Sequence, residues 1–300
     1  MKTYTTTLIA GLILFSCSFV FGQDYAFRVL AVKGSNEVKS GGSWQPLKTG
    51  ASLRSADEIK LVENAYVGLV SVKGKPLELK AAGNYQVSAL ESDVSKGGSS
   101  VLTKYTDFIL SSNSAEAKKN KLSATGAVHR GTESAAIQVM LPPNQHSGVF
   151  NHTAVISWDD KTPGPYVVTL RNMFDDVLAK IETADNSIEV DLGDSKYATE
   201  NAILVEVSSK SDPKLVSQQH LIKKLTSSDQ EKVKKSLNEI IGEVSEPTAL
   251  NKLLLAGFYE ESNLFIDAIS AYEEAIKLAP DVPYYKEAYD EFLSRHGLKN

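Results

Sequence analysis

Four side chains that could bind a metal ion lie close together in the sequence: His146, His152, Asp159 and Asp160. Imidazole nitrogens and carboxylate oxygens are common ligands of Zn²⁺. Their spacing fits no established ligand pattern, and His146 lies in a polar stretch. We therefore expect a solvated loop and no metal site. A metal or catalytic site would require His146, His152 and Asp159 to converge within about 4 Å.

The remaining acidic and basic pairs form no catalytic set either. Asp175-Asp176 and Asp185-Asn186 are typical of turns, and Glu273-Glu274 is expected on the solvated outer face of a helix. His129-Arg130 could bind an anion, but a polar loop is the simpler interpretation. The sequence contains no HExxH, GxSxG or GxGxxG motif and no phosphate-binding loop. We expect no enzymatic activity and no cofactor, with a hydrolase or a carbohydrate-binding protein as the alternative.

The first residues predict export. Lys2 precedes an almost entirely apolar run, Leu8–Val20, and Val20-Phe21-Gly22 offers a cleavage site at its end. This pattern is typical of a secretory signal peptide over residues 1–22. A retained N-terminal anchor and lipoprotein processing at Cys17 are the alternatives. We expect a bacterial protein of the periplasm or cell envelope, or a secreted one, with no membrane-spanning helix after cleavage.

Composition narrows the class further. Cys17 is the only cysteine among the 300 residues, so the mature chain would contain no disulfide and no cysteine metal ligand. The formal net charge of −5 argues against nucleic acid as a partner, because neutralising phosphates needs clustered Lys and Arg. A dense basic cluster, Lys118, Lys119 and Lys121, lies in a polar stretch typical of a linker. The length is enough for two or three domains with their own cores.

The first domain is predicted over residues 23–92 as a small all-β unit. Short runs of alternating apolar residues are separated by turns such as Gly34-Ser35-Asn36 and Gly83-Asn84. Many short strands at this spacing predict a small sandwich or barrel. Trp44 is expected in its core, with an exposed binding residue as the alternative.

These strands resemble the periplasmic β domain of FecR-type proteins. The positions that carry the resemblance are Val38, Trp44, Pro46, Leu47, Gly50, Leu53, Asp57 and Ile59. Ala56 stands where the family usually has Gly. The resemblance implies an envelope location and, as an alternative function, an accessory role in envelope signal transduction. The signal relay of that family also uses a cytoplasmic tail and a spanning helix, which we do not predict here.

Residues 93–130 are predicted as a linker. Ser95–Ser100 is rich in Gly and Ser. Val101–Leu110 could form a short helix or a strand, and Ser111–Ser123 is typical of an exposed helix end or a disordered linker.

A second β domain is predicted over residues 131–210. Tyr166–Leu170 is a strong strand candidate, and apolar runs follow at Val177–Ile181, Ser187–Val190 and Asn201–Val207. The set resembles an immunoglobulin-like or fibronectin-type β-sandwich, which implies that Trp158 is the aromatic residue between its sheets.

The remaining residues, 211–300, predict a helical domain. Apolar periodicity indicates helices at Val216–Leu225, Asp229–Ile241, Ala249–Glu261, Phe265–Leu278 and Tyr284–Leu293. Asn263 is expected in the turn before Phe265, and Pro280 stops the helix that starts there.

Two of these helices resemble a tetratricopeptide repeat. The matching positions are Leu255, Ala256, Tyr259, Ala268, Tyr272, Ala275 and Pro280. The small residues mark where two helices touch, and the tyrosines fill the space between them. The resemblance implies a rigid groove that binds another envelope protein or a peptide, and a generic helical bundle is the alternative. We therefore expect a multidomain α+β protein that acts in the cell envelope as a non-catalytic binding or scaffolding protein.

Overall fold

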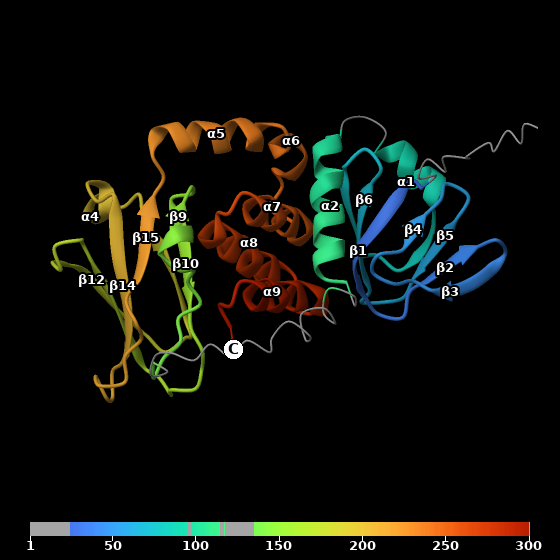
Figure 1. The fold of residues 1–300 in the computed structure, drawn as a ribbon. Helices are drawn as coiled ribbons and strands as arrows, with labels where there is room; N and C mark the ends of the chain where they lie inside the picture. The colour runs from blue at the N-terminus through green and yellow to red at the C-terminus, as the bar shows by residue number, and fades with distance from the viewer. Residues whose placement is uncertain (1–24, 95–97, 115–116, 118–134, 300) are drawn as a thin grey trace, which may run out of the picture.

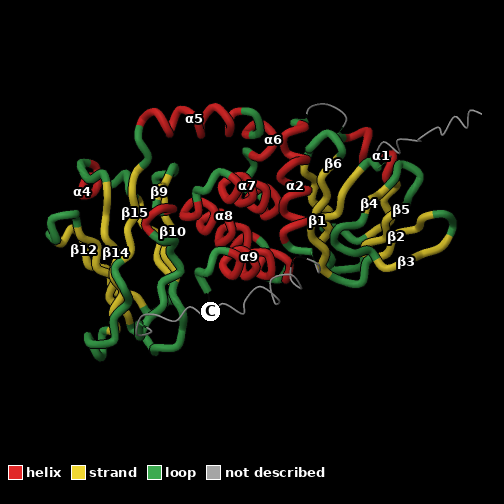
Figure 2. Tube along the Cα trace, in the orientation of Figure 1, coloured by secondary structure: helices red, strands yellow, loops and turns green. Residues whose placement is uncertain are grey.

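The computed structural model describes residues 25–94, 98–114, 117 and 135–299. The predicted signal peptide with Cys17, the lysine cluster at Lys118, Lys119 and Lys121, and His129-Arg130 lie outside the described residues. Two β regions lie at the two ends of the molecule, and a group of helices lies between them (Figure 1 and Figure 2). The predicted α+β class is confirmed.

The N-terminal β region consists of two four-stranded antiparallel sheets. Its strands are β1 Phe27–Lys33, β2 Glu37–Ser40, β3 Ser43–Pro46, β4 Ser52–Leu53, β5 Glu58–Leu61, β6 Tyr66–Ser71, β7 Pro76–Leu79 and β8 Gly83–Gln86. The first sheet has the order β4-β1-β6-β7, and the second has the order β3-β2-β5-β8. Side chains that include Phe27, Val29, Ile59 and Leu69 form one hydrophobic core.

Strand β6 shows that this region is covered on two sides. All six of its residues are buried, because both faces of the strand have neighbours. Val67 and Leu69 belong to the core of the β region, whereas Tyr66 and Val70 belong to the core of the helices. Since successive strand residues point to opposite faces, β6 joins the two cores.

The prediction that Trp44 lies in the core is wrong. Trp44 is 38% exposed on β3, whose four residues are all exposed. The ammonium groups of Lys39 and Lys60 lie 5.8 and 5.9 Å from the centre of its ring. β3 is the edge strand of its sheet, and its side chains are exposed. The indole therefore lies at the surface, beside two cations that are attracted to its ring.

Two helices follow the N-terminal sheets, α1 Val87–Asp93 and α2 Ser100–Ser112. The hydroxyl of Ser99 accepts the N–H of Val101 and caps α2. The buried face of α2 consists of Leu102, Tyr105, Thr106 and Ile109. The stretch predicted as a linker therefore contains a helix of 13 residues, which lies between β6 and the C-terminal helices (Figure 1).

The central β region contains a five-stranded mixed sheet and a two-stranded sheet. Its strands are β9 Gly148–Val149, β10 Thr153–Ser157, β11 Tyr166–Arg171, β12 Val177–Thr183, β13 Ser187–Asp191, β14 Ala202–Ser209 and β15 His220–Lys224. The larger sheet has the order β12-β11-β14-β15-β9, in which β15 and β9 are parallel, and β10 pairs with β13. Trp158 is buried, as expected, with its ring 5.2 Å from that of Tyr166 in an edge-to-face contact. Two short helical turns, η1 Asn144–His146 and α4 Ser195–Ala198, complete the region.

The prediction of a helix at Val216–Leu225 is wrong, because β15 occupies this stretch and extends the central sheet. Ile222 pairs with Ile203 on the buried face, and Leu221 pairs with Leu204 on the other. The apolar residues of a short run can fit the alternation of a strand as well as the period of a helix. Here the segment forms a strand because it pairs with β14, whose edge would otherwise be unpaired.

The remaining helices are α5 Ser227–Asn238, α6 Ile241–Val244, α7 Ala249–Glu261, α8 Phe265–Leu278 and α9 Pro283–Arg295, and α7 and α8 have the predicted bounds. Four of these helices were predicted; the helix expected at Asp229–Ile241 ends at Asn238, and α6 was not predicted. Asn263 makes the turn between them in the left-handed region, at φ 57°. Over residues 25–94, 98–114, 117 and 135–299, no helix is long and apolar enough to cross a membrane.

Gly257 allows α7 and α2 to approach closely, because a Cβ at this position would lie 2.9 Å from Cδ1 of Ile109. We expect Gly257→Leu to lower the free energy of unfolding by about 2 kcal/mol through overpacking. Gly242→Ala in α6 is the control, since a Cβ there meets nothing within 4 Å. Chemical denaturation measures both variants. Addition of Ile109→Ala to Gly257→Leu should restore part of the loss, and no restoration would argue against the contact.

Candidate functional site

The residues that match the tetratricopeptide pattern form the interior of the α7–α8 hairpin. Ala256, Ala268 and Ala275 have no exposed surface, and Tyr259 and Tyr272 are buried beside them. Leu255 is also buried. Pro280 follows the end of α8 at Leu278. The small side chains let the helices approach closely, as the repeat pattern requires.

The other side of α7 is covered by α2. The rings of Tyr105 and Phe258 make an edge-to-face contact at 5.6 Å, and Ile109 fills the space above Gly257. Every residue of α7 from Ala249 to Glu260 is buried, with the exception of Lys252. This side of α7 is thus covered by a helix of the same chain.

A first polar joint connects the helices to the N-terminal β region, through Glu78 of β7. Its Oε1 atom accepts the N–H of Leu250 at 2.9 Å and the hydroxyl of Tyr66 at 2.8 Å. Tyr66 in turn shares a 2.5 Å hydrogen bond with the hydroxyl of Tyr285 in α9. Burial acts to raise the pKa of Glu78, but hydrogen bonds from Lys80, Leu250 and Tyr66 outweigh it and lower the pKa.

A second polar joint connects α8 to the central β region, through Asp267, Ser270 and Glu273. The Asp267 carboxylate accepts the N–H groups of Phe150 and Asn151 at 2.9 and 2.8 Å. Ser270 accepts the N–H of Val155, and Glu273 accepts the hydroxyl of Ser157, each at 2.9 Å. These three residues follow a spacing of three, so one stripe of α8 lies along β10. Glu273 therefore lies at an interface, and its predicted place on a solvated face is wrong.

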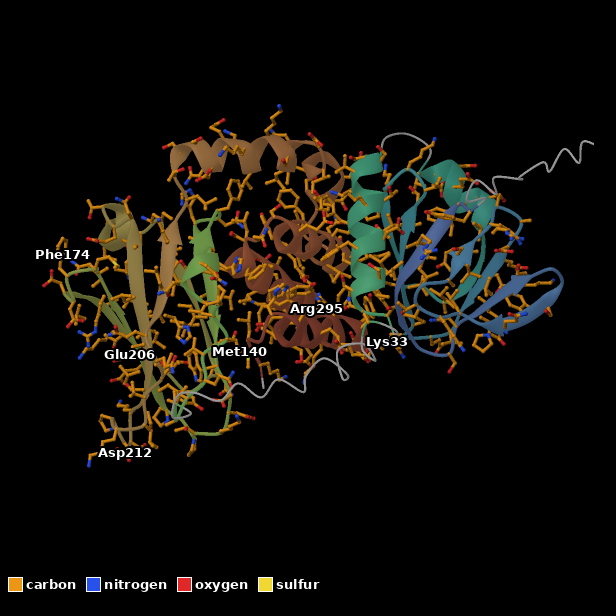
Figure 3. All side chains as sticks on the ribbon, in the orientation of Figure 1. Lys33, Met140, Phe174, Glu206, Asp212 and Arg295 are labelled. Atoms are coloured by element: carbon orange, nitrogen blue, oxygen red, sulfur yellow. The ribbon has the colours of Figure 1, made fainter. Side chains whose placement is uncertain are left out.

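A buried ionic cluster lies between α7, α8 and α9. The Glu260 carboxylate accepts three hydrogen bonds from Arg295 at 2.9 to 3.1 Å, one from the Tyr272 hydroxyl at 3.2 Å, and lies 2.9 Å from Nε2 of His296. Arg295 also donates to the carbonyl of Ser112 at the end of α2. Figure 3 shows Arg295 among the central helices. Burial acts to raise the pKa of Glu260, but His296 and Arg295 outweigh it and lower the pKa.

This cluster has the properties of a structural element. The Glu260 side chain is 3% exposed, and both of its oxygens are already occupied by donors. An acid or base in catalysis needs reach to a substrate atom, which Glu260 lacks. The cluster instead links the ends of α2, α7 and α9.

His146, His152 and Asp159, which were considered as a possible metal site and not expected to form one, lie in separate surroundings. The ring of His146 stacks on that of Phe265 at 4.6 Å, and His152 lies beside Gly193. Asp159 accepts the N–H of Gln138 at 3.0 Å and pairs with Lys161. In the described part of the chain, no three His, Cys, Asp or Glu side chains are placed to hold a metal ion.

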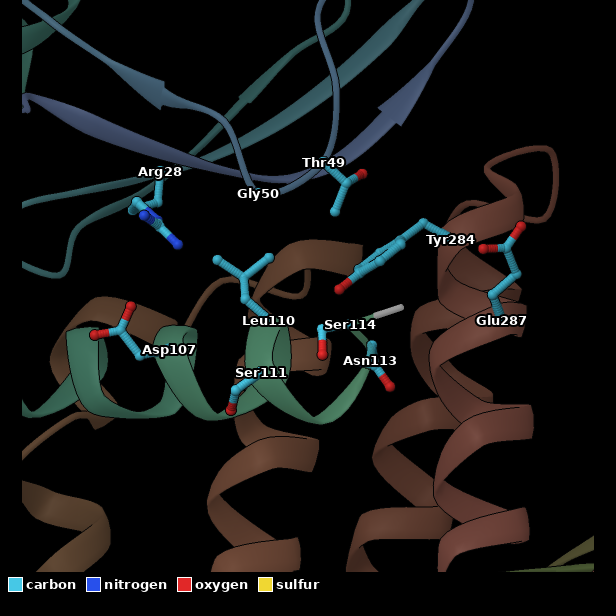
Figure 4. A pocket seen from close by; sticks show the side chains of 10 residues that line it. All are labelled: Arg28, Thr49, Gly50, Asp107, Leu110, Ser111, Asn113, Ser114, Tyr284 and Glu287. Atoms are coloured by element: carbon cyan, nitrogen blue, oxygen red, sulfur yellow. The ribbon is translucent and has the colours of Figure 1, made fainter. Parts of the chain in front are cut away.

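A cleft of about 630 Å³ lies where the N-terminal β region meets the ends of α2 and α9 (Figure 4). Its charged residues are Arg28, Asp107 and Glu287. Arg28 donates to the Ser52 hydroxyl at 3.0 Å. The charges have mixed sign, and the Ser111 hydroxyl donates to the carbonyl of Phe108.

The buried carboxylates Glu78 and Asp267 of the joints, and Glu260 of the ionic cluster, were not predicted from the sequence. Asp267 interrupts the apolar run FIDAIS, and Glu260 ends the run LLLAGFYE, and both side chains are buried. A charged residue on the apolar stripe of a helix is the signal that could have identified them. Glu78 carries no such signal, because β7 is short and half-buried.

Asp267→Asn tests the second joint through its pH dependence. Burial raises the pKa of Asp267 to about 6, although the N–H groups of Phe150 and Asn151 act in the opposite direction. The ordinary value in an unfolded chain is about 3.9. Since the folded state binds the proton more tightly, this group adds stability as the pH falls from about 7 to about 4.

We therefore expect the stability difference between wild type and Asp267→Asn to shift in favour of wild type by on the order of 2 kcal/mol over that range. Urea unfolding across the pH range measures the shift. Asp185→Asn, an exposed residue, is the control and should show none. A pH-independent difference for Asp267→Asn would contradict the buried joint.

No protein-family model matches this chain, and a search of the curated proteins found no match. The function of the chain is therefore inferred from the geometry of the joints and from the residues themselves.

Proposed function

We propose that this chain is a non-catalytic scaffolding protein of the cell envelope. In this proposal the helical hairpin holds two β regions in a fixed relative orientation. The single observation that supports it is the pair of polar joints. Glu78 connects the N-terminal region to α7, and Asp267 connects α8 to the central region. The N-terminal signal pattern is the reason for proposing the envelope location.

The finer classification of the three parts belongs to the same proposal. The N-terminal region is FecR-like, the central region is an immunoglobulin-like or fibronectin-like sandwich, and the hairpin is tetratricopeptide-like. The strand pattern around Val38 and Ile59, the buried Trp158 and the buried alanines of the hairpin support the three parts respectively. The hairpin then performs the binding role of such a repeat within its own chain, with α2 in place of a partner.

A partner that binds the helical part would have to use a surface that the chain itself leaves uncovered. Helix α5 has no buried residue. Its side chains Glu231, Lys232, Lys234, Lys235 and Asn238 line an open cleft of about 470 Å³. We propose that this basic face binds an acidic segment of another envelope protein, because lysines on an open surface attract negative charge.

Small-angle X-ray scattering tests the scaffolding role. We expect the wild-type chain to scatter as one compact particle, and the double variant Glu78→Ala, Asp267→Ala to show a larger radius of gyration, because each joint loses a buried acceptor. The matched control is Glu63→Ala, Asp185→Ala, which removes the same charge from exposed positions. A compact double variant with unchanged scattering would argue that the joints do not hold the β regions.

Capture from an envelope extract tests the partner surface. We expect full-length wild type to retain a defined set of proteins, and Lys234→Glu, Lys235→Glu to lose it, because the charge of α5 is reversed. The control Lys48→Glu, Lys214→Glu makes the same charge change on the two β regions. Equal retention by all three proteins, measured by quantitative mass spectrometry, would count against α5.

A further inference from the structure

The larger central sheet has one open edge. Its strand order is β12-β11-β14-β15-β9, and the edge strand β9 lies against α8. The other edge strand, β12, lies at the end of the molecule farthest from the N-terminal β region (Figure 1). No strand within the described residues pairs with the outer side of β12. An exposed row of main-chain donors and acceptors is a template for another strand.

The main-chain groups that β12 directs outward follow from the hydrogen bonds of the neighbouring ladder, between β11 and β14. The N–H of Lys210 donates to the carbonyl of Pro165 at 2.8 Å, and the next pair along this ladder is Tyr166↔Ser209. Bonded pairs alternate along an antiparallel ladder. The main-chain groups of Tyr166, and those of Val168 two residues further on, are therefore directed to β12.

Two residues of β12, Lys180 and Glu182, are left to pair with an added strand. The partners of Tyr166 and Val168 on β12 are Thr183 and Ile181. Lys180 and Glu182 alternate with these partners, so their N–H and C=O groups are directed outward. Side chains alternate along a strand in the same way. Those of Lys180 and Glu182 are exposed, whereas Ile181 packs against the core of the central β region.

The charges of these two residues are only partly neutralised within one chain. Among the described residues, the ammonium group of Lys180 has no ion-pair partner. The ammonium group of Lys210 pairs with Oε2 of Glu182. Lys210 follows the end of β14, so it approaches Glu182 from the β11 side of the strand. The outer side of Glu182 therefore stays open to a second cation.

A second copy of β12 fits this edge in one register. With a twofold axis at Ile181, Lys180 of each copy lies opposite Glu182 of the other, and Ala179 lies opposite Thr183. Residues with outward main-chain groups then face each other, as bonded pairs require. An axis at Lys180 or at Glu182 keeps this phase but sets two like charges opposite each other, which is unfavourable. Of these three registers, the charges favour the one centred on Ile181.

The side chains on the inner face of β12 suit the same register. Ile181 is half-buried at the edge of the core. At the axis it would meet Ile181 of the second copy as a non-bonded pair, whose Cα atoms approach to about 4.5 Å. Ala179 and Thr183, on either side of it, are small. Association would therefore bury the part of Ile181 that is exposed in a single copy.

We propose that two copies of this chain associate through β12, in antiparallel pairing about a twofold axis at Ile181. Such an interface is isologous, because both copies contribute the same residues. The axis of an antiparallel pair is perpendicular to the sheet, so the two central sheets continue into each other. The two N-terminal β regions then lie at opposite ends of an elongated dimer (Figure 1). The inference does not depend on whether the polar joints fix the β regions.

Sedimentation equilibrium of the purified protein tests the association. We expect a dimer whose fraction rises with concentration. Lys180→Glu and Glu182→Lys should each weaken it about tenfold or more, because each replaces the opposite-charge pairs by like-charge pairs. The double variant Lys180→Glu, Glu182→Lys has the net charge of wild type and should restore most of the loss. An equimolar mixture of the two single variants should associate more tightly than either variant alone, since every opposed pair is then of opposite charge.

Disulfide cross-linking tests the register without a charge change. Ile181→Cys places two thiols at the axis, where a Cα separation of about 4.5 Å is within the range of a disulfide. Thr183→Cys is the matched control, because the two copies of this position are four residues apart along the pair, about 13 Å. Both variants also carry Cys17→Ser, so each chain has a single cysteine. We expect a cross-linked dimer from Ile181→Cys and none from Thr183→Cys.

Three results would overturn the proposal. One is a protein that stays monomeric at every concentration, because β12 would then pair with another protein or with none. Another is a dimer that both single charge variants leave unchanged, or that the double variant fails to restore. The third is equal cross-linking of Ile181→Cys and Thr183→Cys. Scattering from the joint variants is compared where sedimentation shows monomers, so a failed scaffold and a failed dimer are distinguishable.

Discussion

The arrangement of this protein depends on burying the α7–α8 hairpin between two β regions. Apolar contact supplies the driving force, since one core includes Leu30 and Tyr66 of the N-terminal strands together with the helices. Apolar contact is non-directional, so by itself it would let the helices slide along the β regions. The hydrogen bonds of the Glu78 and Asp267 carboxylates require a defined geometry and therefore fix the position of the helices. A shift of α8 along β10 would leave Asp267 buried without the N–H groups of Phe150 and Asn151, and an unpaired buried charge is costly.

The ionic cluster around Glu260 extends the same constraint to the ends of the helices. Arg295 connects the last turn of α9 to Glu260 in α7 and to the carbonyl of Ser112 in α2. Its planar guanidinium group can serve both acceptors at once, which an ammonium group could do less well. The helical part is therefore joined by packed alanines and tyrosines in its middle and by charged hydrogen bonds at its rim.

Local patterns in the sequence predicted the parts of the fold that depend on local rules. The bounds of α7 and α8 followed from apolar periodicity and the turn at Asn263, and in the structure the Thr248 hydroxyl caps α7. β15 could not be predicted in this way, because its strand conformation depends on the free edge of β14. The burial of Trp44 was predicted wrongly for a related reason. Its exposure depends on which face of the β2–β3 hairpin is exposed to solvent, and the local sequence does not determine this. The joints were missed because they connect residues far apart in the chain, such as Tyr66 and Tyr285, which are 219 positions apart.

The meeting of Tyr66 with Tyr285 also has a consequence for how the chain acquires its shape. Strand β6 is made early in synthesis, and α2, which packs against it, follows soon after, but α9, which carries Tyr285, is among the last elements made. Lys33 near the start of the described chain likewise pairs with Asp281 near its end. Closing such distant contacts is slow compared with forming local ones. Helix α2 can therefore cover part of the outer face of β6 early, whereas the Tyr66 hydroxyl gains its Tyr285 partner only when the chain is nearly complete.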